Sequence, residues 1–165
     1  MTRPASMAGW RDLEQGAPKI ARLGMARLAA VPVAMLGTVR PDGSPRISPV
    51  EPCLEGGQLL IGAMAWSRKA ADLHRDPRYV LHSVVTGPDT GEGELKLHGS
   101  AAPAGPELRA AATRAWWSGH PEQAAVFLLG IATALFIEWD LGHGVMATHH
   151  WSPRNGYRHS TRRYP

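Results

Sequence analysis

One stretch of the chain, AWSRKAADLHRDP at residues 65–77, places a hydroxyl side chain directly before two cations. Ser67 is a residue type that caps helix N-termini, and Pro77 cannot continue a helix, so the stretch predicts a helix between them. Arg68 and Lys69 then lie in its first turn, where cations oppose the helix dipole. A bound anion would remove this conflict, because free backbone N–H groups and both cations would contact it. A solvated basic turn and a phosphate site both remain open from this stretch alone.

Three short apolar runs precede this helix. They are PVAMLGTVR (32–40), PRISPVEPCL (45–54) and QLLIGAM (58–64). The separators PDGS and EGG contain Asp-Gly and Gly-Gly, which are hairpin turn signals, so the runs predict an antiparallel meander. The second run carries three prolines, which lack a backbone donor and restrict it to an edge strand or a bulged strand.

The chain after Pro77 alternates further strands with helical segments. RYVLHSVVT (78–86) and ELKLHGSAA (94–102) are typical of strands, and PELRAAATRAWW (106–117) is typical of a helix that begins with proline. PEQAAVFLLG (121–130) repeats that Pro-Glu start, and TALFIEWDL with GVMATHHW predicts a final hairpin around LGHG. A helix over 17–30 precedes the strands. Six or seven short strands with a few helices favour a small antiparallel barrel.

Length and composition indicate one domain over residues 1–165, with a helical segment at 1–30 and a basic tail at 151–165. The net charge is +4, yet the tail alone holds four arginines and no acid, which leaves 14 basic against 14 acidic residues elsewhere. A neutral body argues against a nucleic-acid-binding face. The lone Cys53 excludes a disulfide within the chain, and no secretory signal or membrane-spanning run is visible, so we expect a cytoplasmic protein.

The order of these motifs resembles the pyridoxamine 5'-phosphate oxidase-like family of FMN-binding split barrels. The resemblance covers roughly residues 28–103 and is carried by TVRPDGSPRISPV, EGGQLLIGAM, SRKAADLHRDPRYVLHS and GELKLHGSA. It implies a mainly β (α+β) fold, a six- to seven-stranded antiparallel split β-barrel with two to four peripheral helices. It also implies a homodimer with FMN at the subunit interface, and an oxidoreductase that moves a hydride between a reduced nicotinamide or small organic substrate and the flavin.

The resemblance also implies which residues bind the cofactor. The FMN phosphate would contact Ser67, Arg68 and Lys69 together with Arg46, and the flavin ring would lie against the short strand before the helix. Arg46 and Ser48 lie two residues apart and therefore on one face of a strand. The implied cofactor-binding residues are Arg46, Ile47, Ser48, Gly62, Ala63, Met64, Ser67, Arg68 and Lys69.

Departures from the family pattern predict a substrate other than pyridoxamine phosphate. The oxidases have hydroxyl-bearing and aromatic residues where this chain has Gly62 and Ala63, and a lysine for the substrate phosphate near the position of Glu51. No residue stands out as a catalytic base, since in flavin chemistry the cofactor carries the reaction.

Several alternatives stay open from the sequence. A deazaflavin would present a phosphate to the same cluster, and a non-enzymatic flavin or haem carrier would use the same fold, although nothing selects one haem ligand among His74, His82 and His98. A metal site at His149 and His150 is not expected, because neighbours on a strand point to opposite faces.

The basic tail has three possible roles. It could cover the partner subunit's flavin through Trp151 and the arginines, it could be a frayed end, or it could contact RNA or DNA through its arginines and interleaved aromatic residues.

Overall fold

The structure is a computed structural model that describes residues 7–85, 93–116 and 123–164. Within these residues the helices are α1 (Trp10–Gly16), α2 (Pro18–Ala30), α3 (Arg68–Arg75) and α4 (Pro106–Trp116). The strands are β1 (Ala34–Val39), β2 (Pro45–Val50), β3 (Pro52–Glu55), β4 (Gln58–Met64), β5 (Arg78–Ser83), β6 (Glu94–Pro103), β7 (Ala124–Asp140), β8 (Val145–Ser152) and β9 (Gly156–Arg163). The ends of two predicted segments, Thr86 and Trp117, and the Pro-Glu start at 121–122 lie outside the described residues.

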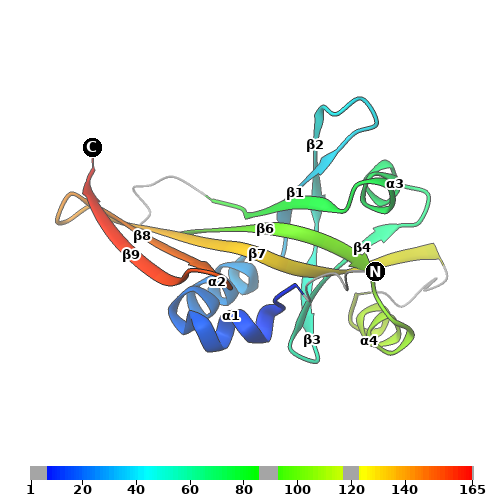
Figure 1. Cartoon of the computed structure of the whole chain (residues 1–165), viewed down its shortest axis with the longest axis horizontal. Coiled ribbons are helices and arrows are strands. Elements are labelled where there is room, and N and C mark those ends of the chain that lie inside the picture. Colours follow the sequence, from blue (N-terminus) through cyan, green and yellow to red (C-terminus); the bar gives the residue numbers. More distant parts are fainter. Residues whose placement is uncertain (1–6, 86–92, 117–122, 165) are drawn as a thin grey trace.

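All nine strands form one antiparallel sheet (Figure 1). The hydrogen-bonded order is β2-β1-β5-β6-β7-β4-β3, and β8 and β9 continue from β7. In the described part of the chain β2 and β3 end this order and do not pair with each other, so the sheet is not closed. The predicted class, a mainly antiparallel β fold with peripheral helices, is confirmed. The predicted six or seven strands become nine because the run 45–54 divides in two and the basic tail adds β9.

The proline-rich run forms two strands at opposite ends of the sheet order. β2 pairs with β1, with Arg46 opposite Thr38, whereas β3 pairs with β4 across the Gly56-Gly57 turn. Both glycines have positive φ, which this tight turn requires. The edge position predicted from the prolines is confirmed for both strands. The predicted three-stranded meander is wrong, since the chain crosses from one edge to the other at Glu51.

The 17-residue strand β7 joins the two parts of the sheet. Its first residues pair with β4 and its last residues pair with β8, while β6 follows its other edge. The Pro-Glu start therefore leads into a strand rather than a helix, because from Ala124 onward buried and partly buried side chains largely alternate. At the β6–β7 bulge a Cβ on Gly99 would lie 1.8 Å from the Gly130 carbonyl oxygen, so the close approach of the two strands requires glycine there.

Helices α1 and α2 cover one face of the sheet, where both pack on β7 and α2 also packs on β6, and Figure 1 shows them beneath these strands. The sequence predicted one helix over 17–30, and the structure has α1 in addition to α2. Trp10 and Leu13 of α1 and Ile20 of α2 are fully buried against this face. Trp151 of β8 is also in this core, and a Cβ on Gly16 would lie 2.3 Å from its indole nitrogen.

The other two helices lie at the opposite end of the molecule from β9 (Figure 1). Helix α3 packs on β1, β4 and β6, and α4 packs on β3, β4 and β7. Both helices therefore contact β4, the strand on which the resemblance places the flavin ring. Among the described residues, none of the four helices has the length and apolar character needed to cross a bilayer.

Candidate cofactor site

The first turn of α3 has the capped form that the sequence predicted. The Ser67 hydroxyl accepts a hydrogen bond from the backbone N–H of Ala70 at 3.4 Å, and the helix ends at Arg75, with Asp76 as its C-cap directly before Pro77. This turn contains no acidic residue, so Arg68 and Lys69 lie beside the positive end of the helix dipole without compensation within the turn. Such an end is suited to binding an anion.

A cavity of about 500 Å³ opens beside this turn, which we call the apolar cavity. Its walls come from β2 and the residue after it, from β4, from the first turn of α3, and from α4 and β7. The lining residues are Pro49, Val50, Glu51, Gly62, Ala63, Met64, Trp66, Ser67, Lys69, Thr113 and Ala124. All three residues predicted to contact the ring, Gly62, Ala63 and Met64, line this cavity together with Ser67 and Lys69.

A second, shallower pocket of about 460 Å³ lies on the other side of the same turn. We call it the arginine pocket, and it is lined by Arg40, Pro41, Asp42, Arg46 and Arg68. The predicted phosphate cluster is therefore divided: Ser67 and Lys69 line the apolar cavity, whereas Arg46 and Arg68 line the arginine pocket. A phosphate at the N-terminus of α3 would lie between the two.

The two cations of the first turn differ in their surroundings. The Lys69 ammonium donates a hydrogen bond to the Pro49 carbonyl oxygen at 2.8 Å, and burial lowers the pKa of this amine. Arg68 is exposed and makes no hydrogen bond or ion pair with the described part of the chain. Lys69 thus joins α3 to β2 already, while the guanidinium of Arg68 is available to a ligand.

Arg46 forms an ion pair with the buried carboxylate of Asp72. Its Nε donates to Asp72 Oδ2 at 2.6 Å, and the Thr38 hydroxyl donates to the same oxygen at 2.9 Å. Arg75 donates to the other oxygen of Asp72 at 3.5 Å and to the backbone carbonyl of Val39. Burial acts to raise the pKa of Asp72, but the hydrogen bonds from Arg46, Thr38 and Arg75 outweigh it and lower the pKa. The carboxylate is therefore ionised at neutral pH.

The remaining predicted residues of β2 lie outside both cavities. Arg46 and Ser48 are half-buried, whereas Ile47 between them is 71% exposed on the opposite face of the strand. Neither Ile47 nor Ser48 is among the described residues that line the apolar cavity or the arginine pocket. The structure brings together seven of the nine predicted residues and leaves these two beside the site.

Four further residues line or support the site, and the sequence did not predict them. Trp66 lines the apolar cavity with 81% of its surface exposed, and its position directly before the cap residue could have signalled a role. Arg40 follows β1 and could have been found beside the Asp-Gly turn. Thr113 of α4 and Asp72 of α3 carry no local signal, because only tertiary packing brings α4 to β4 and the buried face of α3 to β2.

The histidine pair lies far from these cavities and takes no part in them. His149 is buried and its two ring nitrogens lie 2.6 Å from Glu138 Oε2 and 2.7 Å from the Tyr157 hydroxyl. His150 points to the other, half-exposed face, as strand alternation predicted. The described residues contain no group of three side chains that could hold a metal ion.

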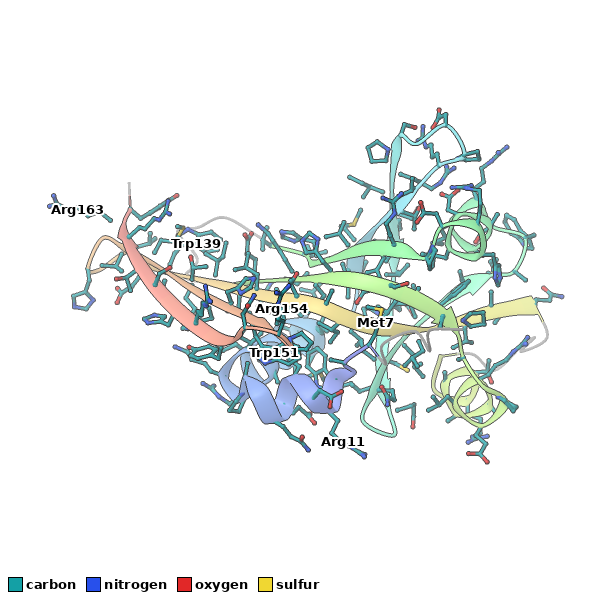
Figure 2. All side chains as sticks on the ribbon, in the orientation of Figure 1. Met7, Arg11, Trp139, Trp151, Arg154 and Arg163 are labelled. Atoms are coloured by element: carbon teal, nitrogen blue, oxygen red, sulfur yellow. The ribbon has the colours of Figure 1, made fainter. Side chains whose placement is uncertain are left out.

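The basic tail is an ordered strand in the structure. β9 pairs with β8 from Gly156 opposite Ser152 to Arg163 opposite Val145, so its described residues are not frayed. Figure 2 shows Trp151 near the N-terminal helices and Arg163 at the distant end of the molecule. The predicted capping role of Trp151 is therefore wrong, because this side chain is buried in the core of its own chain.

An FMN-like ligand fits this site in size and chemistry. The apolar cavity lies within the volume range of small-molecule sites, and its lining from β2, β4 and β7 is mostly apolar, as a flat aromatic ring system needs. A hydroxyl, an ammonium and two guanidinium groups surround the adjoining helix N-terminus, which matches a phosphate. The residues that would hold the group are thus Gly62, Ala63 and Met64 for the ring and Ser67, Arg68, Lys69 and Arg46 for the phosphate.

Solved structures of low sequence identity share this fold. PhzG from Burkholderia lata 383, in complex with tetrahydrophenazine-1-carboxylic acid, is 12% identical with a TM-score of 0.67 over 97% of this chain and 94% of its own. A pyridoxamine 5'-phosphate oxidase-related, FMN binding protein from Nostoc punctiforme PCC 73102 is 14% identical with a TM-score of 0.60, over 90% and 96%. A heme binding protein from Mycobacterium smegmatis is 15% identical with a TM-score of 0.53, over 99% and 90%. These similarities confirm the split-barrel fold.

The comparison of sequences identifies the family. No curated protein matches the chain. The family model described as Pyridoxamine 5'-phosphate oxidase matches residues 25–135, which includes β1 to β6 and both cavities beside α3. Because this match extends over more than half of the chain, the protein belongs to the pyridoxamine 5'-phosphate oxidase family.

Proposed function

We propose that this protein binds FMN and transfers a hydride between the flavin and a reduced nicotinamide or a small organic substrate. One observation carries the proposal: an apolar cavity ends at a helix N-terminus whose first turn has cations on both sides. An aromatic ring and a phosphate on one ligand need these two environments side by side.

Each part of the site has a defined task in this proposal. The Gly62–Ala63 segment of β4 presents little side chain, so a planar ring can approach the backbone there. The Ser67 hydroxyl, Lys69 and the first-turn backbone N–H groups would bind the phosphate from one side. Arg46 and Arg68 would bind it from the arginine pocket.

The chain has to supply binding and orientation rather than acid-base groups. When FMN is bound, its ring system accepts or donates the hydride, so no protein nucleophile is required. The mostly apolar lining of the cavity excludes water from the reacting face of the ring. We therefore assign no catalytic residue among the side chains of the site.

A second copy of the chain is the proposed partner, with the cofactor at the interface. Met64 and Trp66 line the cavity yet are 36% and 81% exposed, and Ile47 on the neighbouring edge strand β2 is also exposed. Exposed apolar side chains gathered at one cavity mark an interaction surface. A partner subunit that covers them would also close the open side of the flavin site.

The substrate is proposed to differ from pyridoxamine phosphate. Glu51 lines the apolar cavity, so a carboxylate lies where the sequence pattern of the oxidases has a lysine for the substrate phosphate. A negatively charged group in a partly apolar cavity repels a second anion. A neutral or cationic substrate suits this wall better.

Haem carriage and deazaflavin binding are the alternative functions. A solved structure of similar fold is a heme binding protein, but none of the described histidines lines the apolar cavity or the arginine pocket. A deazaflavin would use the same phosphate contacts as FMN, so the identity of the ring is decided by the ligand that copurifies.

The proposal is tested by the absorption spectrum of the purified protein and by reconstitution with matched ligands. We expect FMN to bind at least about tenfold more tightly than riboflavin, which lacks the phosphate, because charge-assisted contacts strengthen anion binding. Fluorescence titration measures both affinities, and reduction by NADH or NADPH without oxygen tests hydride transfer. Equal affinities for FMN and riboflavin would refute the phosphate site, and a Soret band in the purified protein would favour haem carriage. Sedimentation at increasing protein concentration tests the dimer.

A further inference from the structure

Asp72 is a buried carboxylate that contacts Arg46, a residue of the proposed phosphate site. Its side chain is 3% exposed, and it lies on α3, whose first turn borders the cofactor site. Both of its oxygens are occupied by protein donors, Oδ2 by Arg46 and Thr38 and Oδ1 by Arg75. The carboxylate is buried and both of its oxygens already contact protein donors, so its effect on the site should pass through these neighbours.

The contact with Arg46 uses only one of the donors of the guanidinium. Nε donates to Asp72, while the side chain as a whole remains 19% exposed and lines the arginine pocket. A guanidinium is a planar fork, so fixing Nε fixes the directions in which the terminal nitrogens point. Thr38 lies directly opposite Arg46 in the β1–β2 ladder and binds the same carboxylate oxygen, so strand pairing and side-chain contacts define one geometry.

We propose that Asp72 is a positioning residue that holds Arg46 in the orientation that binds the ligand phosphate. This proposal rests on the proposed function, since Asp72 would support the same phosphate site by orienting a residue that contacts the phosphate. A long, flexible arginine side chain normally loses conformational freedom when it binds a ligand. Here the ion pair with Asp72 orders the guanidinium before the ligand arrives, so less freedom is lost on binding.

Positioning of Arg46 can be distinguished from a direct electrostatic effect of the Asp72 charge on FMN binding. A carboxylate near an anion site disfavours the anion through space, so removing its charge should strengthen FMN binding if nothing else changes. Loss of an oriented Arg46 should instead weaken FMN binding. The two effects of one substitution have opposite signs, so the direction of the change identifies the mechanism.

A purely structural role is the other interpretation to be separated. The Thr38 hydroxyl of β1 donates to Asp72, so this carboxylate joins α3 to β1, and Arg75 of the same helix contacts both Asp72 and the Val39 carbonyl. If Asp72 acted only on the fold, its removal would lower the binding of any flavin that occupies the apolar cavity. If it acts through Arg46, only the ligand with a phosphate should be affected.

The experiment is a double-mutant cycle of Asp72→Asn and Arg46→Ala, with FMN and riboflavin titrated by fluorescence against each variant. We expect Asp72→Asn to weaken FMN roughly 3- to 10-fold, the cost of ordering one long side chain, and to leave riboflavin unchanged. In the Arg46→Ala background the same substitution should not weaken FMN binding further, because the guanidinium that Asp72 would orient is absent. Thr38→Val is the matched control, since it removes a bond to the same oxygen and leaves the Arg46 contact in place.

Clear outcomes would overturn the inference. Tighter or unchanged FMN binding by Asp72→Asn refutes positioning, and so does an equal loss with and without Arg46. If Asp72→Asn does not fold, Arg46→Lys is tested instead. Lysine keeps the positive charge but lacks the rigid planar set of donors through which arginine can contact Asp72 and the phosphate in one fixed orientation. Wild-type affinity of Arg46→Lys then refutes the inference. Failure of the proposed function itself is recognised separately, since the wild-type protein would then not prefer FMN over riboflavin.

Discussion

The Lys69 ammonium donates a hydrogen bond to the Pro49 carbonyl oxygen at 2.8 Å and thereby joins the first turn of α3 to the edge strand β2. Its sequence neighbour Arg68 points into the arginine pocket and has no such contact in the described part of the chain. Two adjacent cations that belong to one predicted anion site therefore differ in what they do for the fold. This difference leads to the first prediction.

Arg68→Ala and Lys69→Ala should have different effects on folding and similar effects on FMN binding. Each variant loses a charge-assisted contact to the phosphate, so we expect FMN binding to weaken by about 1.5–3 kcal/mol in both. Only Lys69→Ala also loses an intramolecular hydrogen bond, and its unfolding free energy should fall by about 1 kcal/mol. Fluorescence titration and urea unfolding measure the two quantities, with Arg68→Lys as the charge-conserving control. Unchanged FMN affinity in both alanine variants would contradict the site assignment.

Pyridoxamine phosphate should not be oxidised at a useful rate. The Glu51 carboxylate lines the apolar cavity and would repel the phosphate of this substrate. Peroxide release with pyridoxamine phosphate measures the activity, and Glu51→Lys is the informative variant because it restores the cation of the oxidase sequence pattern. Robust turnover by the wild-type protein would show that Glu51 does not set the substrate preference.

Removal of β9 should expose flavin bound in the dimer while leaving the core intact. The deletion has to begin after Pro153, because Trp151 is part of the core and its loss would unfold the protein. All eight residues of β9 are exposed, and the strand lies far from α3 in its own chain, so it can cover only a partner's site (Figure 1). We expect stronger quenching of bound FMN by acrylamide in the truncated protein.

The quencher and the competing roles of β9 need their own controls. Iodide is attracted by the arginines of β9, so an effect seen with iodide but not with neutral acrylamide reflects charge and not cover. Equal acrylamide quenching in the full-length and truncated proteins would show that β9 does not cover the partner's flavin. If the strand binds nucleic acid instead, the full-length protein should bind RNA or DNA with a log–log salt slope of about −3 to −4, and the deletion should abolish it.

Acid should remove the stabilisation that Asp72 provides. The pKa of this carboxyl lies below its ordinary value in the folded protein, so its contribution is complete above the unfolded pKa of about 3.9 and is lost as the pH falls through the folded pKa. Asp72→Asn should cost about 3 kcal/mol at pH 6, since it leaves two partly buried cations without their partner. This difference should shrink when urea unfolding is repeated near pH 3.

The exposed pair of Asp76 and Arg78 is the matched comparison. The hydrogen bond from Arg78 lowers the pKa of Asp76 to about 2, but the Arg78 side chain is mostly exposed and the pair is open to solvent. Asp76→Asn should therefore change stability far less than Asp72→Asn, and its effect should decrease with added salt. Equal, pH-independent losses for the two variants would contradict the assignment of Asp72 as a buried ion-paired group.

Local patterns in the sequence determined the elements of this protein and one end of its site. Ser67 and Pro77 bound α3 because capping and proline geometry act within a few residues, and the prolines of β2 and β3 restrict both strands to sheet edges for the same reason. Alternation along a strand likewise placed His149 and His150 on opposite faces. The positions of Gly62, Ala63, Met64 and the first-turn cations followed from the order of the motifs.

Long-range packing decided the rest. The chain crosses at Glu51 from one edge of the sheet to the other, and β7 extends into a strand from Ala124, because pairing with β4, β6 and β8 outweighs the local helix signal. Thr113 and Asp72 reach the cofactor site only through contacts between segments distant in sequence. Trp151 became a core residue since the N-terminal helices cover it. Such contacts are set by how complementary surfaces pack, which the residues of one short segment do not encode.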